Sequence, residues 1–160
     1  MAMRYEDYKR YLSPALAKTT DLVIERGEGS YLWDVNGERY LDFVQGIAVN
    51  ALGHNDPHVR AAIHDQVDKL INGSFNMVNF PTTLILAQRL AQIAPGSLGC
   101  TFFSNGGAEA TDGALKLARA YTGRPCIIAF RGSFHGRTLG ATAVTGSAAK
   151  YRHSYQPLVP

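Results

Sequence analysis

Residues 102–119, FFSNGGAEATDGALKLAR, constrain the fold of this chain more than any other segment. An apolar start, two glycines and an amphipathic continuation predict a short buried strand that turns directly into a helix. Because Gly106 and Gly107 have no Cβ, the backbone can bend sharply there and approach a ligand closely. The first amides of the helix have no intrahelical partner, which suits a phosphate group. The structural alternative is a glycine turn that only joins a strand to a helix.

A second motif, FRGSFHGRT over residues 130–138, follows another apolar run. Phe134 could stack on a flat heteroaromatic ring, and Arg137 could bind a carboxylate through two parallel hydrogen bonds. The alternative is a core role for Phe134, a helix cap at His135 and a surface ion pair at Arg137. Neither motif has the GxxxxGK[ST] or GxGxxG spacing of the common nucleotide-binding loops, which disfavours a dinucleotide binder.

The rest of the pattern predicts an α/β chain. Alternating apolar residues around Asn36-Gly37 predict a two-residue hairpin turn, and Asp56-Pro57 predicts a helix start. The motif helix should bury a stripe made of Thr111, Ala114, Leu115 and Ala118 and should end at Gly123. Strand, helix and strand in this order predict a parallel βαβ unit. The predicted elements are a helix around 5–12, a β-meander over 22–43, an apolar loop over 46–54, helices over 57–73 and 82–94, and core strands at Cys100–Phe103 and Cys126–Phe130.

Composition excludes several classes of function. The 160 residues suffice for one domain, and a net charge of +3 without a block of like charge gives little support for nucleic-acid or membrane binding. The two cysteines, Cys100 and Cys126, each open an apolar run, so we expect buried thiols and neither a disulfide nor a metal site. The polar N-terminus does not read as a signal peptide, and no apolar run approaches membrane-spanning length. We therefore expect a cytoplasmic protein.

Taken together, the two motifs resemble the class III (ω-amino acid) aminotransferases of the 4-aminobutyrate and acetylornithine/ornithine type. Residues 31–59, YLWDVNGERYLDFVQGIAVNALGHNDPHV, are similar to the N-terminal segment of the same family, and the resemblance extends over residues 21–160. It implies a fold-type I enzyme that uses pyridoxal 5'-phosphate and works as a homodimer. It also implies that residues 1–55 form the N-terminal arm and β-meander of the small domain, and that residues 56–160 begin the cofactor-binding large domain.

The resemblance implies five cofactor-binding residues. Gly107 and Ala108 would donate backbone hydrogen bonds to the cofactor phosphate, while Gly106 shapes the turn. Phe134 would stack on the pyridine ring, and His135 would support that loop.

The resemblance also implies two substrate-binding residues. Arg137 would hold a substrate carboxylate, and Ile47 would line the substrate pocket of the neighbouring subunit. Two positions depart from the family pattern. Gly106 stands where the family often has Ser or Thr, and Gly113 replaces a better helix former, which costs the helix roughly 1 kcal/mol relative to alanine.

Transamination needs a lysine that binds the cofactor and moves a proton, and an acid beside the pyridine nitrogen. In the family that the chain resembles, both lie well downstream of the HGRT segment. Lys116 lies about nine residues past the glycine turn, too far away at ~1.5 Å of rise per residue. We therefore assign no catalytic residue in this chain and expect it to be the front portion of a larger protein or one half of a split one. The lysines considered are Lys9, Lys18, Lys69, Lys116 and Lys150.

The function implied is transfer of an amino group from an ω-amino acid, of the 4-aminobutyrate or acetylornithine type, to 2-oxoglutarate in a ping-pong reaction. The alternative from a different class is a non-catalytic fragment or subunit that binds a phosphate-bearing ligand or a complementing partner chain. The absence of the Schiff-base lysine supports this second hypothesis.

Overall fold

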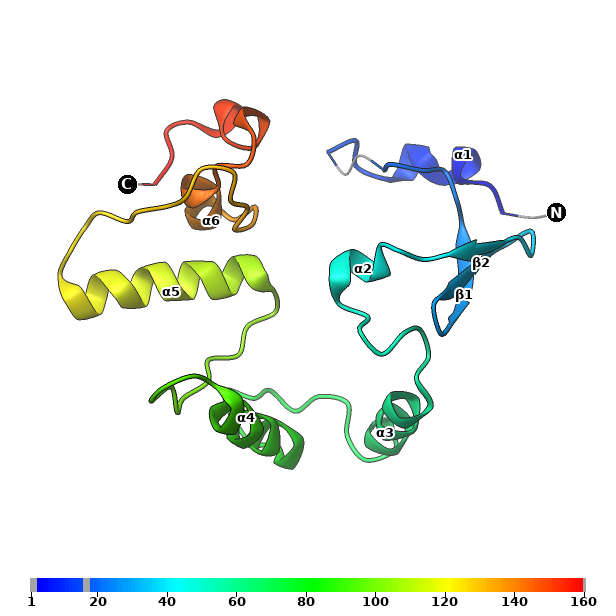
Figure 1. Ribbon diagram of the computed structural model, residues 1–160, viewed down its shortest axis with the longest axis horizontal. Coiled ribbons are helices and arrows are strands. Elements are labelled where there is room, and N and C mark those ends of the chain that lie inside the picture. Colours follow the sequence, from blue (N-terminus) through cyan, green and yellow to red (C-terminus); the bar gives the residue numbers. More distant parts are fainter. Residues whose placement is uncertain (1–2, 16–17, 160) are drawn as a thin grey trace. The chain divides into compact units, whose positions relative to one another are not determined.

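The computed structural model describes residues 3–15 and 18–159 of the chain. It divides into two units, Met1–Val78 and Asn79–Pro160, and Figure 1 traces both as ribbons. No helix in the described part of the chain combines the length and the apolar character needed to cross a membrane.

The first unit opens with the predicted short helix, α1 (Tyr5–Tyr8), which continues into a 3₁₀ turn, η1 (Lys9–Tyr11). The predicted β-meander follows as β1 (Ile24–Glu28), β2 (Tyr31–Asp34) and β3 (Arg39–Leu41). These strands form one antiparallel sheet in the order β1-β2-β3. The alternating residues of this sheet stabilise it by cross-strand pairing, for example through the Arg26 guanidinium, which lies 3.7 Å from the Trp33 ring centroid on the neighbouring strand.

The turn between β2 and β3 differs from the sequence prediction. Asp34 and Glu38 are joined by a backbone hydrogen bond of 3.0 Å, so three residues, 35–37, form the turn. Only Gly37 has a positive φ, at 86°, and Asn36 does not. The Asp34 carboxylate accepts from the backbone amides of Asn36 and Glu38, both at 2.9 Å. These side-chain bonds favour the longer turn over the two-residue one.

Two helices complete the first unit. The predicted apolar loop contains a short helical turn, α2 (Gln45–Ala48). The helix predicted at Asp56-Pro57 is confirmed as α3 (Pro57–Val67), and the Asp56 carboxylate caps it by accepting from the amides of His58 and Val59. The helix ends at Val67, before the predicted stop at Gly73.

The second unit is helical. It contains α4 (Pro81–Ile93), α5 (Gly107–Thr122) and α6 (Leu139–Val144), followed by the 3₁₀ turns η2 (Ala149–Tyr151) and η3 (His153–Tyr155). The predicted C-terminus of the motif helix is confirmed, since Gly123 caps α5 with a left-handed φ of 67°.

The two predicted core strands are absent from the described residues. Residues 100–103 and 126–130 do not belong to a sheet, so the parallel βαβ unit does not form there. An apolar run shows only that a segment suits burial, whereas a strand also needs a neighbour that accepts and donates its backbone hydrogen bonds.

Burial in this unit is also less than predicted. Cys100 and Cys126 are free but exposed. Of the predicted buried stripe on α5, Thr111 and Leu115 are half-buried, while Ala114 and Ala118 are exposed.

Candidate active site

The start of α5 is held in place by its own side chains. Gly106 is the N-cap residue, with an extended backbone. The Glu109 carboxylate reaches back to the backbone amide of Asn105 at 2.8 Å and to its side-chain amide at 3.1 Å. The Ser104 hydroxyl donates to the Gly106 carbonyl at 3.2 Å. Glu109 therefore orders the turn and places a carboxylate in the first helical turn, where the helix dipole favours it.

The space in front of this turn is open. Within the described part of the chain, no side chain caps the amides at the start of α5, which include those of Gly107 and Ala108. A Cβ built on Gly106 or Gly107 would meet no atom within 4 Å. Unpaired amides at a helix N-terminus can donate hydrogen bonds to an anion from solvent.

The second motif packs directly on the first turn of α5. A Cβ on Gly136 would lie 2.5 Å from the Cβ of Ala108, so only glycine permits this approach. The Thr111 hydroxyl lies 3.1 Å from the carbonyl of His135 and 2.9 Å from that of Gly107, within donating distance of both. The structure therefore brings together two motifs that lie about 25 residues apart in the sequence.

Buried Thr145 fixes the other side of this loop. Its hydroxyl accepts from the His135 amide at 3.0 Å and donates to the Ala141 carbonyl at 2.8 Å, and the residue is fully buried. The backbone of His135 therefore ties the loop to both α5 and α6. The sequence did not predict these roles of Thr111 and Thr145, because a threonine at helical spacing does not indicate that its hydroxyl forms a hydrogen bond with a loop distant in sequence.

Phe134 and Arg137 form an aromatic and cationic cluster with Tyr151. The Tyr151 ring meets Phe134 edge-on, with 5.4 Å between ring centroids and 66° between planes. The Arg137 guanidinium lies 5.3 Å from the Phe134 centroid and 5.9 Å from that of Tyr151. Tyr151 was not predicted as a site residue, since no local pattern links it to Arg137 and Phe134, which lie 14 and 17 positions earlier.

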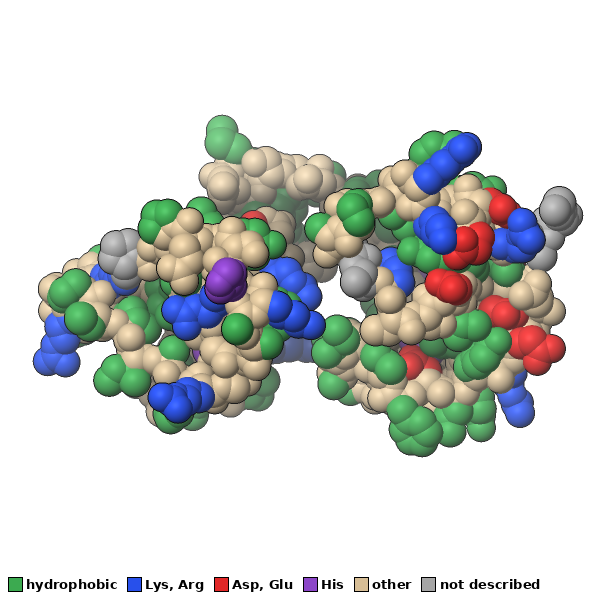
Figure 2. All heavy atoms as spheres, turned by 90° about the horizontal axis from the view of Figure 1, so that it is seen from above, with side chains coloured by type: hydrophobic (Ala, Val, Ile, Leu, Met, Phe, Trp, Pro, Cys, Tyr) green, Lys and Arg blue, Asp and Glu red, His purple; other side chains and the backbone are tan. Residues whose placement is uncertain are grey.

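The surroundings of this cluster carry positive charge. Residues 113–160 include seven lysines and arginines and no aspartate or glutamate. In Figure 2, blue side chains predominate over red ones on the visible face of the second unit, at the left. A surface on which positive charge predominates raises the local concentration of anionic ligands, so this unit favours them. Among the described residues, no group of His, Cys, Asp or Glu is arranged to hold a metal ion.

Ile47 is the one predicted site residue that lies in the first unit. It stands on α2 and its side chain is 85% exposed. Gly106, Gly107, Ala108, Phe134, His135 and Arg137 all lie in the second unit.

Comparison with known proteins supports the family resemblance that the two motifs indicate. The sequence profile of the family described as Aminotransferase class-III matches residues 12–160. The acetylornithine aminotransferase of Archaeoglobus fulgidus is 47% identical over 138 residues, which are 86% of this chain and 36% of that protein. The succinylornithine transaminase of Yersinia pseudotuberculosis is 42% identical over 165 residues, covering 96% of this chain and 39% of that protein. The chain thus spans between a third and two fifths of the length of these relatives.

Solved structures agree as well. The crystal structure of adenosylmethionine-8-amino-7-oxononanoate aminotransferase from Methanocaldococcus jannaschii matches with a TM-score of 0.89 and 33% identity, over 98% of this chain and 38% of that one. The predicted fold class, an α/β chain of a fold-type I pyridoxal-phosphate transferase, is confirmed by this match. With the profile matching almost the whole sequence and the two site motifs packed against each other, the chain belongs to the class III aminotransferase family.

Proposed function

We propose that this protein takes part in pyridoxal-phosphate-dependent transamination of an ω-amino acid, with 2-oxoglutarate as the acceptor. The observation that carries this proposal is the contact between Gly136 and Ala108, by which the FHGR loop packs on the first turn of α5. Acylated ornithine is the first candidate for the amino donor, because relatives named for acetylornithine and succinylornithine are 47% and 42% identical. 4-Aminobutyrate is the second candidate.

The residues present fit the cofactor. Gly107 and Ala108 offer backbone amides for the phosphate, the absence of a Cβ at Gly106 leaves room for it, and the charge of the second unit is favourable. Phe134 would lie against the pyridine ring, and His135 would hold that loop through its backbone. When bound, pyridoxal phosphate supplies an electron sink that stabilises negative charge on the carbon beside the amino nitrogen.

Arg137 would orient the substrate. Its guanidinium lies over the Phe134 ring, and this contact leaves the hydrogen-bonding edges of the guanidinium free for a carboxylate. A carboxylate held by two parallel hydrogen bonds has a defined orientation, so the amino group is presented in one direction. We also propose that Ile47 lines the substrate pocket of the neighbouring subunit, that the enzyme is a homodimer located in the cytoplasm, and that residues 1–55 and 56–160 belong to its small and large domains.

A single backbone amide provides the sharpest test of the phosphate site. Gly107→Pro removes one N–H at the first helical position, where proline is tolerated, and the extended Gly106 suits a following proline. We expect about a tenfold loss of affinity for pyridoxal phosphate, from one lost charge-assisted hydrogen bond. Gly107→Ala keeps the amide and serves as the matched control. Equal affinity of both variants for the cofactor would refute the phosphate site.

The reactive lysine requires a separate test. Lys150 lies near the candidate site, with its ammonium 5.2 Å from the Tyr151 ring centroid. We still propose that no lysine within residues 1–160 is catalytic. Borohydride reduction with pyridoxal phosphate, followed by peptide mapping, should give no stoichiometric adduct within this range. An adduct confined to Lys150 would contradict the proposal.

A non-catalytic role is the second candidate, because no catalytic lysine is assigned within the chain. In this case the chain would bind a phosphate-bearing ligand or a complementing partner chain. Such a protein would bind pyridoxal phosphate and inorganic phosphate through Gly107, but it would not convert acetylornithine or 4-aminobutyrate even with its partner present. Measured amino transfer that depends on Arg137 would exclude this candidate.

A further inference from the structure

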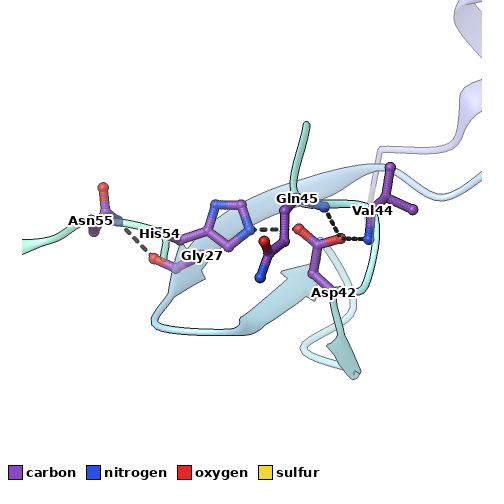
Figure 3. A network of polar contacts seen from close by, with 6 residues as sticks. All are labelled: Gly27, Asp42, Val44, Gln45, His54 and Asn55. Atoms are coloured by element: carbon purple, nitrogen blue, oxygen red, sulfur yellow. Dashed lines mark hydrogen bonds and ion pairs between the residues drawn. The ribbon is translucent and has the colours of Figure 1, made fainter. Parts of the chain in front are cut away.

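A half-buried, hydrogen-bonded pair joins two distant points of the first unit. The Asp42 carboxylate, at the end of β3, lies 2.7 Å from Nε2 of His54, and their side chains are 7% and 18% exposed. The other carboxylate oxygen of Asp42 accepts from the amides of Val44 and Gln45, at 2.9 and 3.0 Å. Figure 3 shows both oxygens in use, one toward the histidine ring and one toward the backbone. The pair therefore connects the two ends of the segment 44–53.

The segment between these ends is strained. Gln45, Gly46, Ile47 and Ala48 all have positive φ, at 48°, 62°, 64° and 61°. This left-handed conformation costs roughly 1–2 kcal/mol for each residue other than glycine, and β-branched residues such as isoleucine rarely adopt it. Strain of this kind persists only where the surrounding contacts hold it in place.

The contacts of the segment itself do not explain its conformation. Its large apolar side chains are exposed, so burial contributes little to holding the turn; these side chains are Phe43, Val44, Ile47, Val49 and Leu52. The backbone carbonyls of Val44 and Gln45 accept hydrogen bonds from the amides of residues 47–50 and close the turn locally. Stabilisation from outside the turn is required, and the Asp42–His54 pair makes contacts at both ends of the segment.

Glycines near the pair permit close packing around His54. A Cβ on Gly27 would lie 2.8 Å from the His54 ring, and one on Gly53 would lie 2.8 Å from the Gly29 carbonyl. Two backbone hydrogen bonds, of 3.0 and 2.7 Å, join Gly29 to His54, and the Asn55 side chain donates to the Gly27 carbonyl at 2.7 Å. His54 is therefore anchored to β1, while Asp42 extends β3.

We infer that Asp42 and His54 are positioning residues that hold the left-handed turn Gln45–Ala48 and thereby fix the outward direction of Ile47. The part of this inference that concerns substrate rests on the proposed function, in which Ile47 lines the pocket. The pair does not contact substrate itself and acts through the turn. The hydrogen bonds from Gln45 and His54 lower the pKa of Asp42, which keeps its carboxylate ionised at neutral pH.

Hydrogen exchange of the protein tests the pair directly. Asp42→Asn and His54→Gln should each speed amide exchange over residues 44–53 by about tenfold, because each loses a charge-assisted hydrogen bond. Asp56→Asn and His58→Gln are matched controls: Asp56 also accepts from two backbone amides and has a nearby histidine, outside the segment. The controls should leave exchange over 44–53 unchanged. Unchanged exchange in Asp42→Asn and His54→Gln would overturn the inference.

A double-mutant cycle tests whether the pair acts through Ile47. In the complete enzyme, His54→Gln should raise KM for the amino donor several-fold with little change in kcat. The same substitution in an Ile47→Ala background should have no further effect, because the positioned side chain is already gone. Additive effects would refute action through Ile47. If the protein shows no amino transfer at all, the proposed function fails, and hydrogen exchange alone decides whether the pair holds the turn.

Discussion

Single residues determine where the FHGR loop lies. Gly136 permits its contact with Ala108, and the Thr145 hydroxyl holds the amide of His135. In the sheet, Asp34 has the same importance, since its buried carboxylate organises a whole turn. Because each of these contacts depends on a single residue, substitutions there should have large effects on the free energy of unfolding.

Gly136→Ala should separate the loop from α5. The added methyl group collides with Ala108, and overpacking of this kind costs about 1–3 kcal/mol of the free energy of unfolding. Gly132→Ala is the control, because Gly132 also has a positive φ but open space around its Cβ position. Urea unfolding of both variants measures the difference. Equal losses would show that backbone strain, and not the contact with Ala108, requires glycine at this position.

Asp34 should make the stability of the sheet depend on pH. Burial alone would raise the pKa of Asp34, but hydrogen bonds from Glu38, Asn36 and Tyr40 outweigh it and lower the pKa. A lowered pKa stabilises the fold above the ordinary value and loses this effect as the pH falls through the folded value. Asp34→Asn should therefore unfold at lower urea than the wild type at neutral pH, and the two midpoints should converge below about pH 4. A difference between the two urea midpoints that stays constant across this pH range would contradict the prediction.

At the scale of elements, α5 was well predicted and α6 was not. The start of α5 at the glycine turn and its end at Gly123 follow from local chemistry, because capping and left-handed glycine involve only neighbouring residues. Helix α6 has no comparable signal in its sequence, LGATAV, and forms against α5. The position of the FHGR loop depends on this packing.

The glycines of these two helices should respond in opposite ways to alanine. A Cβ on Gly113 would lie 3.4 Å from the exposed Phe102 ring, which is an ordinary contact, so Gly113→Ala should stabilise α5 by about 0.5–1 kcal/mol. Gly140→Ala should destabilise the protein, because its Cβ would collide with the Asp112 carboxylate. Chemical denaturation gives both values. A loss of stability in Gly113→Ala would mean that Phe102 cannot move aside.

At the scale of the whole molecule, the chain exposes far more surface than a compact protein. Its accessible surface is 13495 Å², whereas two separate compact units of half its mass would together expose roughly 9,500 Å². Among the described residues, Ala141 is the one buried hydrophobic residue. The exposed apolar side chains thus form faces that need to be covered for stability.

The chain by itself should therefore self-associate. Sedimentation should show a mass that rises with concentration, and Ile128→Glu should reduce this association because Ile128 is 93% exposed. Ser147→Glu adds the same charge at an exposed polar position and is the control. A monomer with a sharp two-state melt at all concentrations would contradict the prediction.

The amino-acid sequence by itself determined the helix starts at Asp56 and Gly106, the meander of three strands and the two motifs of the candidate site. These features depend on capping, turn chemistry and periodicity, which act between residues close together in the chain. Only the tertiary structure decided that Ala108 meets Gly136, that Asp42 meets His54, and that, among the described residues, 100–103 and 126–130 do not join a sheet. Such contacts join residues distant in sequence, and whether they form depends on which surfaces are available to pack together.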